Sequence, residues 1–333
     1  MRSRGVLLGA VVALCVVGAV AYVVLASGQS DPAAAVLPPQ PAMTPSAPGA
    51  KPLDPHLRIA VRAVSARDPR LPGRVYVVDP AHPGARQSRD LACLRVYSSA
   101  GHGICLYLAH SGVDYRAALL GPGYRVIRTM PITGVPSRTR ISPDGRHGAI
   151  TTFTLGDSYA NAGQFSTRTS LVDMTKGRVI GDLEQFTVLE DGRVTDAPDH
   201  NFWGVTFARD GDTFYATLAT AGHHWLVRGS IRARRVTILR DAVECPSLSP
   251  DGTRIAFKKT LGKGRWRLSV LDLRTLRDAP LAERRSIDDQ AEWLDDAHVA
   301  YGDGTDVWEV PADGSGAPVR LIRGAQSPVA LRG

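Results

Sequence analysis

Lysine, aromatic residues and cysteine are all scarce in this sequence. Lysine supplies only five of the 40 basic residues, aromatic residues make up 6% of the chain, and there are four cysteines. The arginines are scattered, and even a dense cluster such as Arg232–Arg235 is short. Nucleic-acid arms need a dense basic run, and single-strand platforms need interleaved aromatic rings. The sequence therefore argues against a nucleic-acid partner, and its net charge of +8 predicts a basic, solvated surface.

Sequence motifs of catalytic and metal centres are also missing. There is no phosphate-binding loop, and no constellation of a nucleophile with its base is visible. His223 and His224 are adjacent, so on a strand they point to opposite faces, and no third ligand lies at a recognised spacing. The stretch Asp303–Asp306 is explained by turn chemistry and is not a calcium loop of the helix–loop–helix type. We therefore predict no catalytic residues, no metal site and no cofactor.

A long apolar run occurs at the N-terminus. Residues 5–26 form it without one charge, and a helix needs about 20 such residues to cross a bilayer. Because Arg2 and Arg4 precede this run, we expect residues 1–4 to stay in the cytoplasm and the rest of the chain to lie outside. The alternative is a secreted protein, released by signal cleavage near Ala26, but the run is longer than a typical signal peptide core.

Residues 27–55 are rich in proline, alanine and serine. Such a composition cannot build a core, and its prolines favour an extended, semi-rigid spacer. We expect a single-pass protein of the cell membrane, anchored by residues 5–26, whose linker holds the domain of residues 56–333 on the extracytoplasmic side.

A short turn recurs along this domain. Its glycine-equivalent positions are 101, 145, 211, 252 and 296, which are spaced by 44, 66, 41 and 44 residues. Proline presets φ at the second turn position, aspartate suits the third, and glycine takes the left-handed position that follows. Asp296 replaces glycine in one copy, and aspartate tolerates that conformation better than most residues. A repeat of about 40 to 45 residues corresponds to one four-stranded blade of a β-propeller.

Five hairpins are visible, and the ends of the chain supply a sixth blade. The segments 57–61 and 74–78 read as strands without a preceding turn of the repeat type, and 327–331 reads as a strand without a following partner. Pairing this last strand with the N-terminal ones would close the ring and remove its exposed edge. We predict an all-β, six-bladed β-propeller of four-stranded antiparallel blades, preceded by one N-terminal transmembrane helix.

The hairpin pattern S-P-D-G-x-x-[IVA]-A-[FY], seen in Ser249–Phe257 and Ser142–Ile150, resembles the PD40 repeat of TolB-like propellers. That resemblance implies an extracytoplasmic propeller that binds proteins or small ligands. The partner-binding N-terminal domain of TolB has no counterpart here, since anchor and linker precede residue 57. The same repeat occurs in the propeller lids of prolyl-oligopeptidase-like enzymes, but those carry a hydrolase domain with a Gly-x-Ser-x-Gly elbow. Asp313–Gly316 is a polar hairpin loop without that pattern.

The 66-residue step contains about 22 residues more than one blade needs. The candidate insertions are 156–164, between the second and third strands, and 184–201, before the next blade. Both connections leave an up-and-down blade on the rim opposite the Asp-Gly turns, and loops that depart from a repeat often form its binding surface. The alternative is that they are tolerated surface insertions. The candidate binding residues on this rim are Tyr159, Asn161, Gln164, His200, Asn201 and Trp203.

Cys93 and Cys105 flank the turn at Ser98 and are expected to face each other across that hairpin. An exported protein permits a disulfide between them. Cys245 would then be a single buried thiol, and Cys15 lies in the anchor. The alternative is that these cysteines are small core residues.

Two function classes remain open. The sequence favours a non-catalytic protein- or ligand-binding module of the cell envelope, whose partner is an envelope protein or a small ligand. The alternative is an exported six-bladed propeller hydrolase or lactonase, in which carboxylates and asparagines from several blades would hold a metal in the central channel. A sialidase-like propeller is less well supported, because its motif needs an aromatic residue after S-x-D-x-G.

Overall fold

The computed structural model describes residues 52–64, 73–109, 112–154, 166–195, 197–262 and 264–332. The predicted cytoplasmic end, the transmembrane segment 5–26 and most of the linker 27–55 lie outside these ranges. Within the described ranges, no helix is long and apolar enough to cross a membrane. The described residues belong to one compact unit, residues 45–333.

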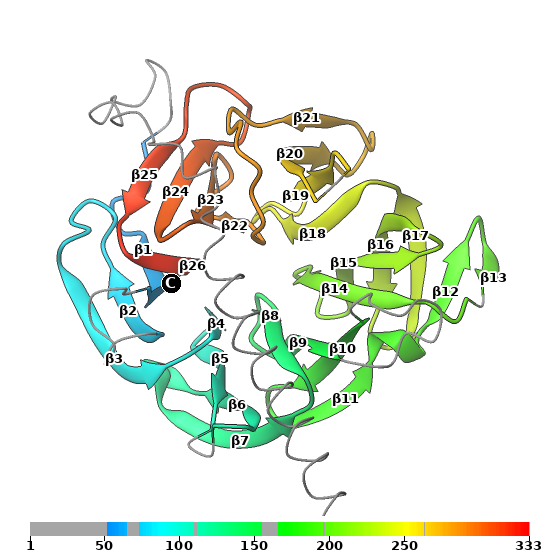
Figure 1. The fold of residues 1–333 in the computed structure, drawn as a ribbon, viewed down its shortest axis with the longest axis horizontal. Coiled ribbons are helices and arrows are strands. Elements are labelled where there is room, and N and C mark those ends of the chain that lie inside the picture. Colours follow the sequence, from blue (N-terminus) through cyan, green and yellow to red (C-terminus); the bar gives the residue numbers. More distant parts are fainter. Residues whose placement is uncertain are drawn as a thin grey trace, which may run out of the picture. The chain divides into compact units, whose positions relative to one another are not determined.

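Six β-sheets surround a common axis in this unit, and the chain runs through them in order (Figure 1). The predicted six-bladed, all-β propeller is therefore confirmed. Blades 1 to 3 are built from the following strands, given from the axis outward. Blade 1 contains β26 (Ala325–Leu331), β1 (Arg58–Ala63), β2 (Arg74–Val78) and β3 (Arg86–Ala92); blade 2 contains β4 (Arg95–Ser99), β5 (His102–Leu108), β6 (Tyr115–Leu120) and β7 (Val126–Ile132), with the 3₁₀ turn η1 (Pro122–Tyr124); blade 3 contains β8 (Val135–Ile141), β9 (His147–Thr154), β10 (Ser166–Asp173) and β11 (Arg178–Asp182).

Blades 4 to 6 repeat this antiparallel arrangement. Blade 4 contains β14 (Asn201–Phe207), β15 (Thr213–Thr220), β16 (His223–Ser230) and β17 (Arg235–Arg240); blade 5 contains β18 (Val243–Leu248), β19 (Arg254–Thr260), β20 (Trp266–Asp272) and β21 (Asp278–Pro280); blade 6 contains β22 (Glu292–Trp293), β23 (His298–Asp303), β24 (Asp306–Pro311) and β25 (Val319–Ile322).

The ring closes through the two ends of the domain, as predicted. β26 is the innermost strand of blade 1 and pairs antiparallel with β1, with Ile59 opposite Ala330 and Ala60 opposite Val329. β1 in turn pairs with β2. The last strand of the domain thus completes the first sheet, which holds the two ends of the domain together and gives blade 1 its fourth strand.

The recurring turn is held by side chains as well as by its backbone. In the turn between β8 and β9, Ser142 Oγ donates to Asp144 Oδ1 (2.5 Å), which also accepts the backbone N–H of Arg146 (3.0 Å). Gly145 follows with φ of 73°, in the left-handed region where glycine is unstrained. Ser249, Asp251 and Gly252 repeat the same geometry between β18 and β19.

The expected left-handed conformation of Asp296 is wrong. Asp296 is not among the residues with positive φ. The preceding aspartate, Asp295, instead accepts the backbone N–H groups of Ala297 (2.7 Å) and His298 (2.9 Å), so this turn is satisfied without a residue at the glycine position.

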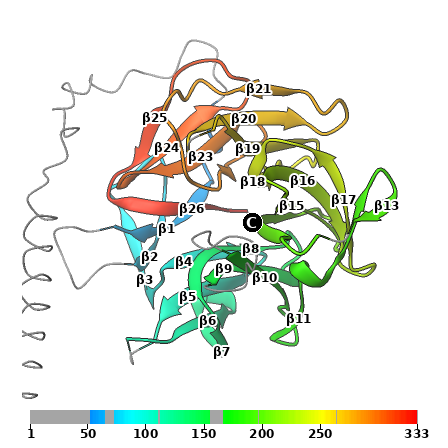
Figure 2. The ribbon, with the colours of Figure 1, turned by 45° about the vertical axis from the view of Figure 1, so that its right-hand side comes forward.

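Blade 4 departs from the predicted four-stranded pattern. The 3₁₀ turn η2 (Leu183–Gln185) leads from β11 into β12 (Thr187–Glu190) and β13 (Arg193–Thr195), and β12 pairs parallel with β17. The sheet of blade 4 therefore has six strands, and Figures 1 and 2 both show this hairpin outside β17. The hairpin covers the outer edge of β17, whose N–H and C=O groups would otherwise face solvent.

The insertion is anchored in the core between blades 3 and 4. Phe186, 5% exposed, meets Phe214 edge to face with ring centroids 6.1 Å apart. Both rings belong to a buried cluster that also contains Leu171 of β10 and Phe202 of β14, each 0% exposed. Burying two such side chains completely is worth about 2–3 kcal/mol each, which is enough to hold the start of the insertion in one position.

Candidate functional site

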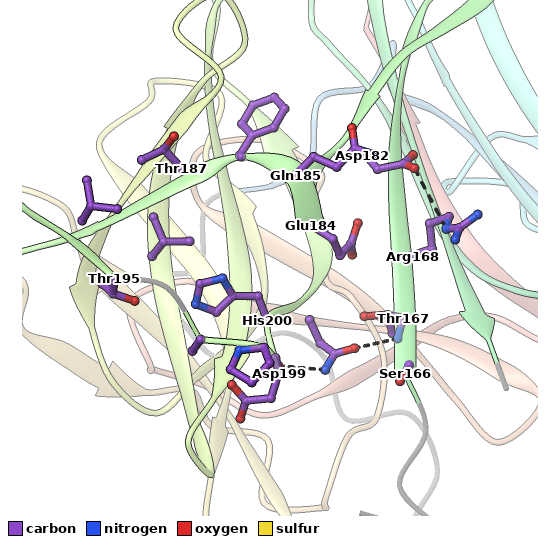
Figure 3. A pocket seen from close by; sticks show the side chains of 16 residues that line it. Ser166, Thr167, Arg168, Asp182, Glu184, Gln185, Thr187, Thr195, Asp199 and His200 are labelled. Carbon is purple, nitrogen blue, oxygen red and sulfur yellow. Dashed lines mark hydrogen bonds and ion pairs between the residues drawn. The ribbon is translucent and has the colours of Figure 1, made fainter. Parts of the chain in front are cut away.

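A pocket of about 590 Å³ opens between blades 3 and 4, next to the insertion (Figure 3). It lies at the end of the blades where β11 stops and β14 begins, which we call the insertion rim. Residues from β10, β11, η2, the β12–β13 hairpin and the start of β14 line it. The polar lining residues used below are Thr167, Arg168, Asp182, Glu184, Asp199, His200 and Asn201.

The pocket exists because β11 is short. β9 pairs with β10 over its full length, Ser166–Asp173, but β11 pairs only with Ser170–Asp173. The outer edge of β10 from Ser166 to Thr169 therefore has no strand beside it, and its backbone N–H groups need other acceptors.

Two side chains of the insertion supply those acceptors. The N–H of Thr167 donates to Asn201 Oδ1 at 2.9 Å, and the N–H of Thr169 donates to both carboxyl oxygens of Glu184 at 3.0 and 3.1 Å. The N–H of Phe202 on β14 adds a longer bond to Glu184 Oε1, at 3.4 Å. Glu184 and Asn201 thus connect β10 of blade 3 with β14 of blade 4 along the wall of the pocket.

Glu184 is half-buried and lines the pocket, and its carboxyl group has no cationic partner among the described residues. Among the residues that the structure describes, no lysine, arginine or histidine forms an ion pair with it. Burial is the main reason that the pKa of Glu184 is raised from 4.5 to about 8; the negative charge of Asp182 adds to this rise, and the backbone N–H groups oppose it only in part. At neutral pH this carboxyl group is therefore largely protonated.

Asp182 and Arg168 form the opposite wall. The Arg168 Nε atom lies 4.0 Å from Asp182 Oδ2, and Ser170 Oγ donates to Asp182 Oδ1 at 2.6 Å. Figure 3 shows Glu184 between this pair and His200. The pocket therefore presents one paired and one unpaired carboxyl group to its interior.

Asp199 lines the same pocket, but its carboxylate is engaged elsewhere. It accepts hydrogen bonds from Thr220 Oγ1 (2.6 Å) and the N–H of Ala221 (2.8 Å). Burial alone would raise the pKa of Asp199, but these hydrogen bonds outweigh it and lower the pKa. Asp199 therefore remains charged at neutral pH and fixes the start of β14, whereas Glu184 is largely protonated.

The structure brings together only part of the predicted binding set. His200 and Asn201 line the pocket. Trp203 lies two residues further along β14, but its ring meets His224 edge to face at 5.3 Å and does not line the pocket. Tyr159, Asn161 and Gln164 lie outside the described residues.

Sequence reasoning missed Glu184, Asp182 and Arg168 as parts of the site. Glu184 was recognised only as the first residue of the insertion. No local sequence signal marks Glu184, because the N–H groups that hold its carboxyl group come from Thr169 and Phe202 on two other strands.

The other predicted chemistry-bearing residues have structural partners. Cys93 and Cys105 are joined by a disulfide with Cα atoms 5.4 Å apart, and Cys245 is buried. His223 and His224 face different carboxylates, Asp241 at 2.8 Å and Glu244 at 2.9 Å. In the part of the chain that the structure describes, no group of three or more His, Cys, Asp or Glu residues is placed to hold a metal ion.

Ion pairs cross the central channel at two levels. On β8, Arg140 pairs with Glu292 of β22 and also donates to Ser247 Oγ (2.9 Å). Two residues earlier, Arg138 lies 3.9 Å from Asp288, whose carboxylate accepts a hydrogen bond from Lys258 Nζ at 2.5 Å. The channel carboxylates named here are therefore neutralised by side chains of facing blades.

Comparisons with known proteins agree with this architecture. TolB from Acinetobacter baumannii matches with a TM-score of 0.60 at 17% sequence identity, over 84% of this chain and 68% of that one. The fold is a TolB-like six-bladed propeller. A chain in the crystal structure of a nidogen/laminin complex matches with a TM-score of 0.53 at 11% identity, over 82% of this chain and 98% of that one.

A putative TolB from Agrobacterium tumefaciens matches more weakly, with a TM-score of 0.49 at 14% identity over 81% of this chain and 91% of that one. Likenesses at these identities establish the fold alone. No protein-family model and no curated protein matches the sequence.

Proposed function

We propose that this TolB-like propeller is a non-catalytic binding module of the cell envelope. Residues 5–26 anchor it in the membrane, residues 27–55 act as its spacer, and the insertion rim receives an extracytoplasmic protein or a small ligand. The observation that carries the proposal is the pocket between blades 3 and 4. It is built by the one insertion of the described chain that departs from the blade pattern, and irregular loops on a regular scaffold are where repeat proteins place binding surfaces.

The groups that line the pocket support binding over catalysis. Glu184 and Asn201 are held by backbone N–H groups of β10, and Asp199 is held by Thr220 and Ala221. None of these contacts pairs a nucleophile with a base, whereas fixed acceptors around a cavity are what orients a ligand.

The alternative function, a hydrolase or lactonase with a metal in the channel, would need carboxylates free to converge on one ion. Glu292 and Asp288 instead pair with Arg140 and Lys258. Metal analysis of the purified full-length protein separates the two functions, because stoichiometric, tightly bound metal would favour the hydrolase.

Site-specific photo-crosslinking in living cells tests the proposed rim. A photoreactive residue replaces Gln185 or Val194, both exposed at the pocket, in the full-length membrane protein. The matched control carries it at Arg209, an exposed residue in the turn between β14 and β15 on the opposite rim. Adducts from the pocket positions alone are expected. Adducts from Arg209 alone would place the binding surface on the other rim and contradict the proposal.

The location is tested separately, with a reporter enzyme that is active only outside the cytoplasm. Fused after Gly333, it is expected to be active, and fractionation is expected to recover the fusion with membranes. Recovery in the soluble fraction after cleavage near Ala26 would favour the secreted alternative.

A further inference from the structure

We propose that the pocket between blades 3 and 4 binds a primary ammonium group on a hydrocarbon stem, and that the ammonium group displaces the carboxyl proton of Glu184 when it binds. This inference rests on the proposed function, because it names the ligand chemistry of the same pocket. A lysine side chain of a partner protein and a free alkyl amine share this chemistry, and the experiment below distinguishes them.

The first step is the position of Glu184. Its carboxyl group lies on the wall of a cavity of about 590 Å³ and is fixed from behind by the N–H groups of Thr169 and Phe202. The donors of these hydrogen bonds belong to β10 and β14. The carboxyl oxygens have further lone pairs to accept a donor from the pocket side.

The second step is charge. From β11, Asp182 contributes a negative charge, which Arg168 of β10 offsets across 4.0 Å. Asp199, before β14, contributes a second negative charge, directed at Thr220 and Ala221, and His200 follows it on the wall. Arg234, in the turn between β16 and β17, is a further nearby positive charge. It lies over the Phe186 ring and donates to the carbonyl of Ile180 at 3.0 Å.

An ionised Glu184 would therefore add an uncompensated negative charge to a pocket whose lining already includes two carboxylates. Burying such a charge without a partner is costly, so the Glu184 carboxyl holds its proton. An ammonium group supplies the missing positive charge and three donors. A neutral ligand supplies no charge, and an anionic ligand would be repelled.

The third step is the shape of the lining. Val194, which is 69% exposed, gives the pocket an apolar side chain, whereas Phe186 and Val188 are buried behind its wall. An alkyl stem of four or five carbons can lie along the exposed Val194 side chain while its ammonium group binds Glu184, as lysine stems do along apolar surfaces. A compact inorganic cation has no stem to contact this side chain.

Proton release gives the proposal a specific signature. The carboxyl group is largely protonated at neutral pH, whereas an alkyl ammonium keeps its charge up to a pH of about 10. Binding should thus release nearly one proton from Glu184 to the buffer at about pH 7. Affinity should rise about tenfold per pH unit between about pH 6 and 8 and level off above, because the ligand selects the ionised carboxylate.

Titration calorimetry of the full-length protein in detergent tests this with three probes: Nα-acetyl-lysine amide, cadaverine and the neutral Nα-acetyl-norleucine amide. The two amines are expected to bind with a heat that varies with the ionisation enthalpy of the buffer, and the norleucine amide is expected not to bind. Tighter binding of the lysine amide than of cadaverine would indicate a protein side chain as the source, and the reverse would indicate a free amine.

Glu184→Gln keeps the acceptor for Thr169 but cannot ionise. It should lower amine affinity at about pH 8 by tenfold or more and abolish both the proton release and the pH slope. Glu190→Gln is the matched control, since Glu190 is exposed on β12 and does not line the pocket, and it should bind as the wild type does. A thermal melt of each variant confirms that it is folded.

Equal binding of the neutral probe, or amine binding by Glu184→Gln with unchanged affinity and slope, would overturn the inference. So would the absence of amine binding at millimolar concentrations. In that last case, crosslinked adducts from Gln185 and Val194 would still support the binding rim, so the two proposals fail separately.

Discussion

Replacing Glu184 by glutamine should make the stability of the propeller less dependent on pH. Between pH 4.5 and about 8 the unfolded chain has released the Glu184 proton, while the folded protein still holds it. The folded state thus binds the extra proton, and raising the pH through this window favours unfolding. Glutamine has no proton to lose, so this contribution disappears in the variant.

The magnitude follows from the size of the shift. A pKa raised from 4.5 to about 8 corresponds, at about 1.4 kcal/mol for each pKa unit, to about 5 kcal/mol of stability lost above pH 8. The carboxyl group is partly exposed in the pocket, so water recovers part of that cost. We expect about 2–3 kcal/mol between about pH 5 and pH 9.

Urea denaturation of both proteins, followed by tryptophan fluorescence at several pH values, measures this difference. The two free energies of unfolding should be similar at about pH 5, and the variant should become the more stable protein as the pH rises toward about 9. Parallel pH profiles would refute the reasoning, since they would mean that Glu184 has the same pKa in the folded and unfolded chains. Glu190→Gln, exposed on β12, should follow the wild type throughout.

Three further predictions concern the scaffold. Replacing Cys93 and Cys105 by serine should lower the free energy of unfolding by about 2–4 kcal/mol. The variant should therefore unfold at a lower urea concentration than the oxidised wild type, and at the same concentration as the reduced wild type. Arg140→Met should cost about 3–5 kcal/mol because it leaves Glu292 buried without its partner, and a second change, Glu292→Leu, should recover most of that loss. Asp251→Ala should lower the free energy of unfolding by about 1 kcal/mol, since three donors of its turn, the Ser249 hydroxyl and the N–H and hydroxyl of Thr253, lose their acceptor; an unchanged urea midpoint would contradict this.

The propeller was predictable because the turn motif that marks its blades is formed by neighbouring residues and recurs along the sequence. Ser142 and Asp144 satisfy their own turn, and Ser249 and Asp251 do the same a hundred residues later, so the motif is visible wherever the structure uses it. Closure by β26 was also predictable, because a ring with an unpaired terminal strand would leave an open edge.

The candidate site was only partly predictable because its contacts are long-range and irregular. The lengths of the repeats indicated where extra residues lie, and His200 and Asn201 were found on that basis. Sequence spacing could not show that β11 stops early, nor that Glu184 would be the acceptor for Thr169. Nor could sequence spacing show that the Trp203 ring lies against His224, on another strand of the blade, and does not line the pocket.

The same feature explains why the pocket lies at this junction of blades. A complete β11 would pair with Thr167 and Thr169, fill the edge of β10 and leave no cavity. Because β11 is short, the N–H groups of Thr167 and Thr169 need other acceptors. A carboxyl group can accept such a hydrogen bond and, when ionised, can also pair with a cationic ligand. Glu184 thus has two roles: it accepts the N–H of Thr169 in the fold, and in the proposed binding it pairs with the ammonium group. The N–H of Thr169 on β10 fixes the carboxyl oxygens of Glu184. A ligand that requires the ionised carboxylate therefore changes the protonation of Glu184 without moving the backbone.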